Sequence, residues 1–533
     1  MTGIAGTGLM VRLTLRRERR IAPWWILVLT ALALVMVSYI ERNMGTPKLL
    51  AQYVSVINDN SFFRALGGGF VVADPDYMAA WRSGGFLYVL NGLAAVLAVV
   101  RHTRADEDTG RTELLRSGVL SRFAPLTAAL LVTGAVSLAG GLIPALALIA
   151  IGLDPVGSLA YAAAIAAAGG VFGGVAAVAA QLSRNARTAR ATGLSALGAA
   201  YILRYAGDAS GQYWMKYVSP IGWSHWVEPY WSDRWWVLAV PVAVTAGLIA
   251  LAYRLNGGRD LGAGLLPERL GPAGSAWLRG PVSLAWSLNR GLLFKWTAAV
   301  AVFAAAAGGV STLADQLAKA PGGQADQLLR GFGGRPGADV VDYGLWAVIL
   351  IFAHVIVMFP VLMVQRLCVE ENSGRAETVL ATTSTRLRWA AGQLVVAGLG
   401  TVVLLAVVGL VLGGFFAMLV GDFGADMWRV FAGAMGTLPA AWLVGAACFL
   451  VYGLLPRFSI AITWLLWLGV FVLGRAAGPL YGLWGGTPFE PFHYVPNTVA
   501  GADFDALPGL IMVALTALLV GGGLLALRRR DFG

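Results

Sequence analysis

The sequence is poor in charged residues and especially poor in lysine. Of its 533 residues, 13% are charged and 58% are hydrophobic, whereas soluble domains carry roughly 25% charge. Lysine occurs only at Lys48, Lys216, Lys295 and Lys319, and none of these residues follows a glycine. A Walker phosphate-binding loop, which needs Gly-Lys-Ser/Thr, is therefore absent. We expect the chain neither to bind ATP nor to hydrolyse it.

Cysteine, histidine and intramembrane acids are also scarce. Two cysteines, Cys368 and Cys448, are too few for a disulfide framework. His225 and His493 lie in similar segments, but no other ligand recurs at metal-binding spacing, so we expect no metal site. The net charge of +11 follows the pattern of membrane orientation, and we predict no nucleic-acid partner.

Long apolar segments predict an all-α polytopic membrane protein, because each is long enough to cross a bilayer as a helix. About twelve such spans are expected. They cover residues 22–40, 86–100, 124–151, 159–182, 191–205, 235–255, 294–313, 345–364, 390–420, 430–454, 459–473 and 507–527. Before the first and seventh spans, residues 8–20 and 284–292 have the pattern of helices that lie in the membrane interface.

A charged run between the second and third spans recurs in the second half of the chain. Residues 104–122 and 368–386 align with a shift of 264 positions, the difference between Gly110 and Gly374. Such a repeat indicates two related halves. We assign residues 1–256 to the first half, 257–283 to a linker and 284–533 to the second half. The matched residues are Asp106, Glu107, Gly110, Arg111, Glu113 and Arg122 in the first copy, and Glu370, Glu371, Gly374, Arg375, Glu377 and Arg386 in the second.

The distribution of basic residues predicts the topology. With a cytoplasmic N-terminus, roughly 27 of the 39 lysines and arginines lie in or beside cytoplasmic segments. Both charged runs and the C-terminus then face the cytoplasm, and six spans in each half give a parallel duplication. The runs are either solvated loops or docking helices that receive force from a partner.

Few polar residues fall within the spans. Asn91, His354 and Arg204 are the candidates, and each is either a polar point in a central cavity or part of an interhelical hydrogen bond. The segments before the sixth and twelfth spans resemble each other and are expected to cap the outer mouth. Their marker residues are Pro220, Trp223 and His225 in the first half, and Pro488 and His493 in the second.

The motif E-x-x-G-R-x-E, followed by Ser/Thr-Arg, resembles the cytoplasmic coupling region of ABC-2 type exporter permeases. The stretches 219–223, 229–230 and 493–496, reading SPIGW, PY and HYVP, resemble the actinobacterial polyketide-antibiotic exporters of the tetronasin type. The resemblance covers nearly the whole chain. The second copy departs from it, because Thr378-Val379 replaces Leu114-Leu115. We therefore do not expect the two copies to couple equally.

This resemblance implies a twelve-span permease of the bacterial plasma membrane that exports hydrophobic compounds. Two copies of a separate ATPase subunit would bind ATP and Mg²⁺ and contact the two motifs, and membrane lipids would surround the spans. Substrate is expected between the halves, near aromatic residues that are otherwise plain packing. These aromatic candidates are Tyr88, Tyr201, Trp464 and Trp467.

Two other classes of protein stay open. Polytopic glycosyltransferases carry acidic residues in the first outer loop, as at Asp74 and Asp76 here, although a proline between the two also favours a plain turn. A proton-driven drug antiporter is the other alternative, which the lack of acidic residues well inside the spans disfavours.

Overall fold

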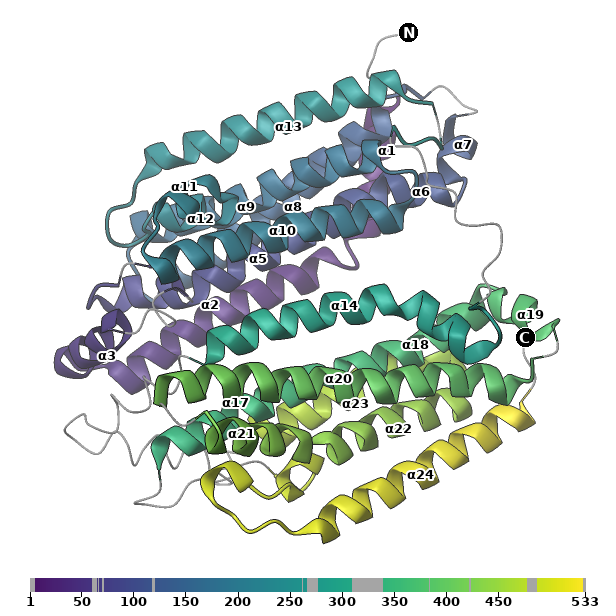
Figure 1. Ribbon diagram of the computed structural model, residues 1–533. Helices are drawn as coiled ribbons and strands as arrows, with labels where there is room; N and C mark the ends of the chain where they lie inside the picture. Colours follow the sequence, from purple (N-terminus) through teal and green to yellow (C-terminus); the bar gives the residue numbers. More distant parts are fainter. Residues whose placement is uncertain are drawn as a thin grey trace. The chain divides into compact units, whose positions relative to one another are not determined.

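A computed structural model describes residues 5–59, 65, 67–69, 71–116, 120–260, 262–265, 277–308, 339–382, 384–420, 423–476 and 487–530. Across these residues every regular element is a helix (Figure 1). The chain is thus an all-α polytopic membrane protein. It divides into two compact units, Met1–Gly271 and Pro272–Gly533.

The first unit contains ten α-helices longer than five residues, two shorter ones and a 3-10 turn within its described residues. In chain order they are α1 (Thr7–Glu18), α2 (Ala22–Met44), α3 (Pro47–Asp59), α5 (Pro75–His102), α6 (Arg104–Asp108), α7 (Arg111–Arg116), α8 (Ala124–Ala150), α9 (Pro155–Leu182), α10 (Ala186–Ser210), α11 (Trp214–Val218), α12 (Pro220–Trp226), η1 (Trp235–Leu238) and α13 (Ala239–Gly258).

The second unit repeats this order with more interruptions. Its described elements are α14 (Pro281–Ala307), α17 (Val340–Ile356), α18 (Met358–Asn372), α19 (Arg375–Leu380), α20 (Arg386–Val420), α21 (Ala425–Gly436), α22 (Leu438–Leu454), η2 (Pro456–Phe458), α23 (Ser459–Gly469), the π-helical η3 (Val470–Ala476), η5 (Pro491–Tyr494), η6 (Thr498–Ala500) and α24 (Ala506–Arg529).

Within the described residues, each of the twelve predicted spans coincides with a helix or a broken pair of helices, and residues 309–313 of the seventh span lie outside the described residues. By length and hydropathy, eight helices of the described chain could cross a membrane. A ninth candidate joins α1 to α2 across a bend of 57°. The spans predicted at 191–205, 294–313 and 459–473 lie in α10, α14 and α23, which are not among these candidates.

Short polar side chains determine where several of these helices begin. Asp74, Asp154 and Asn185 each accept a hydrogen bond from the backbone N–H three residues ahead, at the starts of α5, α9 and α10. Asp339 and Asp505 cap α17 and α24 in a related way. Such caps satisfy donors that the first turn of a helix leaves unpaired.

Small residues allow the long helices of the first unit to pack closely. An added Cβ at Gly141 of α8 would stand 2.3 Å from the carbonyl oxygen of Ala162 in α9. At Gly169 of α9 it would stand 2.5 Å from Ser137 Oγ of α8. Glycine is therefore required at both places, as in other membrane helix pairs whose backbones approach closely.

Two predicted boundaries are wrong. Residues 284–292 do not form a separate interfacial helix, because α14 continues from Pro281 to Ala307 without a break. The stretch between the first two predicted spans, for which the sequence predicts no helix, contains α3 and the first turns of α5. The Asp74 cap and Pro75 start α5 eleven residues before the predicted span at 86, ahead of its most apolar part.

Candidate functional site: the repeated motif and its surroundings

The first copy of the repeated motif forms two short helices instead of one. Gly110, between α6 and α7, has a φ of 70°, a left-handed conformation that favours glycine, and Gly374 has a φ of 69° before α19. Glu107 and Arg111 are four residues apart, a spacing that favours pairing on one helix, but this turn places them on separate elements. Arg111 Nη1 instead lies 3.4 Å from Asp106 Oδ1.

Glu107 binds an arginine from the far end of its own half. Arg259, directly after α13, donates to both carboxylate oxygens of Glu107, from Nη1 at 2.8 Å and from Nη2 at 2.5 Å. Arg104 Nη1 donates to the same carboxylate at 2.6 Å. Arg259 Nε donates to Gln181 Oε1 in α9 at 2.7 Å, and the carbonyl of Arg259 accepts a hydrogen bond from Arg122. The side chains of Glu107 and Arg259 are only 9% and 5% exposed, so these charge-assisted bonds are largely shielded from water.

The acidic neighbours of Glu107 bind the motif to two other helices. Asp106 accepts from both Nη1 and Nη2 of Arg17 in α1, at 2.6 and 3.0 Å. Asp108 Oδ2 accepts from the backbone N–H of Ala186, the first residue of α10, at 2.6 Å. The motif therefore joins the N-terminal helix, the fifth span and the end of the sixth span.

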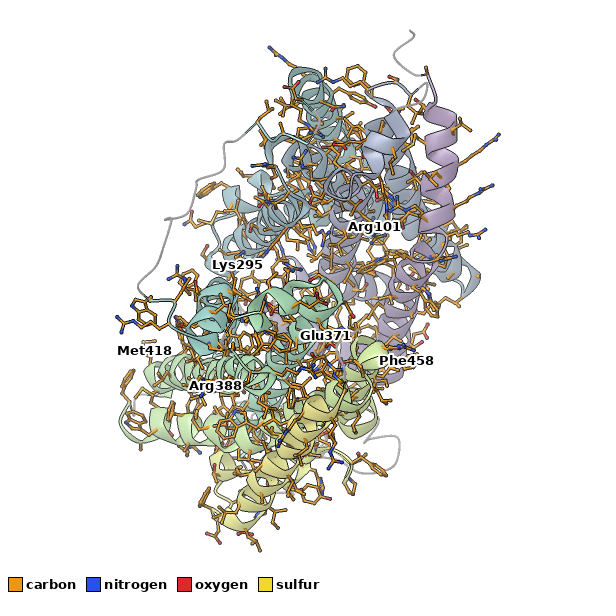
Figure 2. All side chains as sticks on the ribbon, turned by 90° about the vertical axis from the view of Figure 1, so that its right-hand side faces the viewer. Arg101, Lys295, Glu371, Arg388, Met418 and Phe458 are labelled. Carbon is orange, nitrogen blue, oxygen red and sulfur yellow. The ribbon has the colours of Figure 1, made fainter. Side chains whose placement is uncertain are left out.

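A second set of contacts fixes α1 against the end of α5. Glu18 Oε1 lies 2.6 Å from Arg101 Nη1 and 2.6 Å from His102 Nε2. Figure 2 labels Arg101, which lies in the last turn of α5. The helix predicted to lie in the interface is thus attached to α5 directly and to the motif through Asp106.

The next acidic residue of the first copy, Glu113, lies at the surface on α7. Glu113 is exposed, and it makes no hydrogen bond or ion pair with any described residue. The side chain of Leu114 beside it is 78% exposed. The side chain of Leu115 lies outside the described residues. The exposed part of this copy therefore combines a carboxylate with an apolar side chain.

The second copy repeats the central contact of the first. Glu371 Oε2 accepts from Arg530 Nη2 at 2.5 Å and from Tyr452 Oη at 2.6 Å. Arg530 directly follows α24, and its guanidinium lies 4.7 Å above the ring of Tyr452. Arg386 Nη1 donates to the carbonyl of Arg530 at 2.6 Å. Glu371 and Arg386 thus occupy the places that Glu107 and Arg122 hold in the first unit.

The remaining charged residues of the second copy are either bound within the unit or exposed at its surface. Glu370 lies 3.1 Å from Arg366, whose Nη1 donates to Asn289 Oδ1 of α14 at 2.5 Å. Glu377, like its counterpart in the first copy, is exposed and has no polar partner among the described residues. Arg375 Nε donates to Ser373 Oγ at 2.8 Å and is otherwise exposed.

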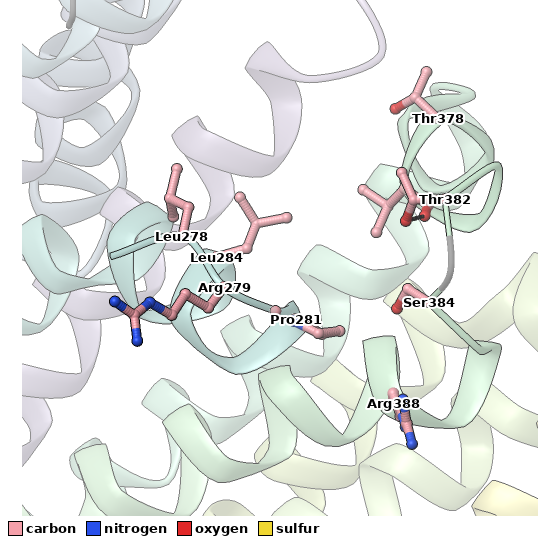
Figure 3. A pocket seen from close by; sticks show the side chains of 10 residues that line it. Leu278, Arg279, Pro281, Leu284, Thr378, Thr382, Ser384 and Arg388 are labelled. Carbon is pink, nitrogen blue, oxygen red and sulfur yellow. Dashed lines mark hydrogen bonds between the residues drawn. The ribbon is translucent and has the colours of Figure 1, made fainter. Parts of the chain in front are cut away.

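A groove of about 430 Å³ runs beside α19 in the second unit. In Figure 3, Thr378 and Thr382 line one side and Leu278 and Leu284 the opposite side, with Pro281 below. Figure 2 labels Arg388, which lies at the edge of this groove.

Asn91 is buried in the middle of the first unit. Its Nδ2 donates to the carbonyl of Ile165 in α9 at 2.8 Å and to the carbonyl of Ser137 in α8 at 3.3 Å. Asn91 therefore joins three helices by hydrogen bonds, which is the interhelical alternative considered for it.

The other cavity candidates of the first unit lie toward its opposite end. Tyr88 is buried, with its ring 4.9 Å from His225 and 6.1 Å from Tyr161. Arg204 is also buried, with its guanidinium 4.8 Å above Tyr201.

Arg204 belongs to a small charged cluster. Asp208 Oδ2 lies 3.4 Å from Arg204, and Asp208 Oδ1 lies 3.7 Å from Lys216 Nζ. Lys216 also donates to the carbonyl of Gly68 at 2.9 Å. Burial, then the charges of Arg204 and Lys216, hold the pKa of His225 well below its usual range. His225 is therefore neutral at physiological pH.

The second unit brings its cavity candidates together. Trp467 Nε1 donates to the carbonyl of His354 at 2.9 Å, and the rings of Trp464 and Trp467 meet edge to face at 5.8 Å. His354 Nε2 lies 3.8 Å from Glu490 Oε1, and both side chains are buried. The two candidate sets belong to different units, so a shared cavity between the halves stays a prediction.

The two outer segments are less alike in structure than in sequence. Pro220 starts α12, Trp223 Nε1 donates to the carbonyl of Tyr217 at 2.6 Å, and His225 is buried. In the second unit the carbonyl of Pro488 accepts from Tyr494, but His493 is exposed. The two histidines are therefore not equivalent, because a short α-helix carries one and a 3-10 turn carries the other.

Two further candidates have structural explanations. Asp74 is the N-cap of α5, where it accepts from Tyr77 N at 2.8 Å, and Asp76 lies in the first turn of the same helix. Within the described part of the chain, no group of three or more His, Cys, Asp or Glu side chains could hold a metal ion.

Sequence reasoning missed the arginines that bind the motif. Arg259 and Arg530 begin the sequences Arg-Asp-Leu-Gly at 259–262 and Arg-Asp-Phe-Gly at 530–533, which are 271 residues apart. This short repeat, at nearly the same shift as the motif, was the signal that could have revealed them. Arg17 and Glu490 carry no comparable signal in the sequence.

The fold and the paired motifs define a duplicated polytopic membrane protein, and comparison with known proteins shows its family. The chain is 39% identical to the multidrug efflux system permease protein Rv1217c of Mycobacterium tuberculosis, over 99% of this chain and 96% of that protein. Residues 278–528 match the family described as multidrug efflux system permease Rv1217c, C-terminal domain. The chain therefore belongs to the Rv1217c family of efflux permeases.

Proposed function

We propose that this chain is the membrane-spanning subunit of an ATP-binding-cassette exporter of the ABC-2 type. It moves hydrophobic compounds, such as drugs, antibiotics or lipid-like molecules, out of the cell. The name of the Mycobacterium tuberculosis relative supports efflux of several drugs. The sequence motifs favour the tetronasin-type branch of antibiotic exporters, found in actinobacteria, and a role in antibiotic resistance.

The energy comes from two copies of a separate ATPase subunit, which bind ATP and Mg²⁺. The resemblance of the two motifs to the coupling region of ABC-2 type permeases and the lack of a Walker motif in the sequence support this proposal. Hydrolysis then belongs to the assembled complex, and the chain alone is a permease.

One observation carries the proposal: each copy of the motif has one glutamate bound within its own unit and one glutamate exposed at the surface. Glu107 and Glu371 are bound within their own units, whereas Glu113 and Glu377, six residues later in each copy, are exposed. An exposed carboxylate contributes little to folding. It suits a basic group on a partner, where an interfacial charge pair can be worth about 2–5 kcal/mol.

The two copies offer different surfaces to the ATPase. The first presents Glu113 with Leu114, which is 78% exposed. The second presents Glu377 with Thr378 and the groove beside α19. We propose that both face the cytoplasm, together with the two chain termini, in the plasma membrane of a bacterium.

The test is the double variant Glu113→Ala with Glu377→Ala. It should insert and fold normally, but ATPase binding should weaken by at least about tenfold, because two interfacial charge pairs are lost. The matched control removes two exposed carboxylates predicted to face outward, Glu41→Ala with Asp503→Ala, and should bind the ATPase normally. Both complexes are compared by affinity measurement in detergent and by drug efflux in cells. Wild-type affinity and efflux in the first double variant would contradict the proposal.

A further inference from the structure

We infer that Glu107 with Arg259, and Glu371 with Arg530, are two equivalent positioning pairs that transmit movement of each motif to the last helix of its own half. This inference rests on the proposed function, because it assigns the next step after the ATPase contacts the motif. It concerns residues that are bound within their own units and that the family match does not assign.

The two pairs have the same construction in both units. In each, the motif glutamate binds the arginine that directly follows the last helix, and 2.5 Å separates the arginine Nη2 from a carboxylate oxygen of the glutamate. In each, the carbonyl of that arginine accepts a hydrogen bond from the last arginine of the motif, which is Arg122 or Arg386. The motif therefore binds both the side chain and the backbone carbonyl of the arginine that follows the last helix.

The fourth span supplies a third member at the same place. Gln181 near the end of α9 accepts from Arg259 Nε, and Tyr452 near the end of α22 donates to Glu371 and lies under the guanidinium of Arg530. Gln181 and Tyr452 are 271 residues apart, as are the two arginines. The same three-part contact thus exists twice although the residue from the fourth span differs.

The helices that these pairs hold lie at the outside of their units. Only 17% of the most apolar part of Trp235–Gly258 and of Ala506–Arg529 is buried, against 44–72% for the other six candidate spans. Each packs mainly along one neighbour, α13 along α9 and α24 along α22. With so few other partners, each helix is well placed to receive a displacement of the motif through the ion pair at its end, although the motif lies about 150 residues away in sequence.

Glu113 and Glu377 complete the path on the partner's side. They lie on α7 and α19, directly after the glycine turn that follows each paired glutamate. A displacement of the exposed carboxylate is transmitted to the paired glutamate through one short turn. The paired glutamate transmits it to the last helix through its arginine.

The second unit is the better place for the test, because its pair carries no additional arginine such as Arg104. Arg530→Glu should leave the ATPase bound and ATP hydrolysis active, but lower the amount of drug transported per ATP by about tenfold, a usual size for coupling between sites. Arg529→Glu is the matched control, since Arg529 is the preceding residue, is exposed and has no polar partner among the described residues. It should change this ratio less than twofold, well below such coupling effects.

Exchange of the two charges separates a positioning role from a merely structural one. Glu371→Arg combined with Arg530→Glu should recover most of the transport per ATP that the single variant loses. Tyr452→Phe, which removes one hydrogen bond to Glu371, should lower the ratio only slightly. An unchanged ratio in Arg530→Glu, or a reduced ratio that the exchange does not recover, would overturn the inference.

A second measurement remains valid if the exchange variant folds poorly. Cysteines at 371 and 530, in a chain without its two native cysteines, should be joined by a short bifunctional thiol reagent. Joining should restore the transport per ATP that the two substitutions remove, and failure to restore it would count against the inference. If the wild-type chain binds no ATPase at all, the proposed function fails instead, and cross-linking still reports whether the pair exists.

Discussion

Asn91 offers a sharp test of what the buried polar residues do. It is 2% exposed, and its amide lies between two glycines, with Oδ1 3.1 Å from an ideal Cβ at Gly140 and Nδ2 2.7 Å from one at Gly169. The amide nitrogen donates to carbonyls of α8 and α9. We consider two substitutions, Asn91→Leu and Asn91→Asp, which keep the approximate size and remove the amide donor.

The structure sets the expected magnitude. Interhelical hydrogen bonds in membrane proteins average about 0.6 kcal/mol, so the loss of two bonds in Asn91→Leu should lower the free energy of unfolding by about 1.2 kcal/mol. Asn91→Asp should cost more, because a carboxylate cannot donate and would face two carbonyl oxygens without water. Drug profile and ATPase binding should change little in the leucine variant.

The assay is unfolding of the purified chain in detergent, alongside efflux of several drugs in cells. A cavity residue that contacts substrate predicts the opposite pattern, with stability retained and the drug profile altered. If Asn91→Leu unfolds like the wild type yet changes which drugs are exported, the hydrogen-bond reasoning is refuted. His354→Leu, made in parallel, tests the corresponding position of the second unit.

Three further predictions concern the chain as a whole. The isolated permease should show no ATPase activity and should support turnover only with its ATPase; robust hydrolysis by the pure chain would contradict this. Cysteines placed at Glu113 and Glu377 in a cysteine-free chain should not react with an impermeant maleimide added to intact cells, and labelling from outside would reverse the topology. Gly110→Ala should cost about 1 kcal/mol because of its positive φ. Gly141→Ala should cost more, because its Cβ would meet a backbone oxygen at 2.3 Å; equal melting temperatures for the two variants would contradict the packing described.

Hydropathy was enough to place the helices. Among the described residues, helices occur at all twelve predicted positions, because an apolar run in a bilayer must satisfy its backbone hydrogen bonds within a helix. Eight of these helices are long and apolar enough to cross a membrane. The ends were less predictable, as at α5, where Asp74 and Pro75 start the helix well before its most apolar part. The continuity of α14 was also not evident, because an amphipathic stretch and an apolar stretch can belong to one helix.

The motif shows where sequence reasoning fails on a site. Spacing suggested that Glu107 and Arg111 share a helix, but the positive φ of Gly110 separates them. Glycine at a helix end was a recognisable signal of this turn. The actual partner, Arg259, lies 152 residues away, and only the recurrence of its short sequence near the C-terminus connects it with the motif.

The two motif copies also differ at one buried position. Arg104, which is fully buried and binds Glu107, aligns with Cys368 in the second copy, where the thiol donates to the carbonyl of Pro456. A permease assembled from two identical subunits would carry the same residue at both places. Because one polypeptide encodes both copies here, each can mutate independently. Selection can then strengthen one copy while the other drifts, so that the two ATPase subunits that we propose need not have equal effects.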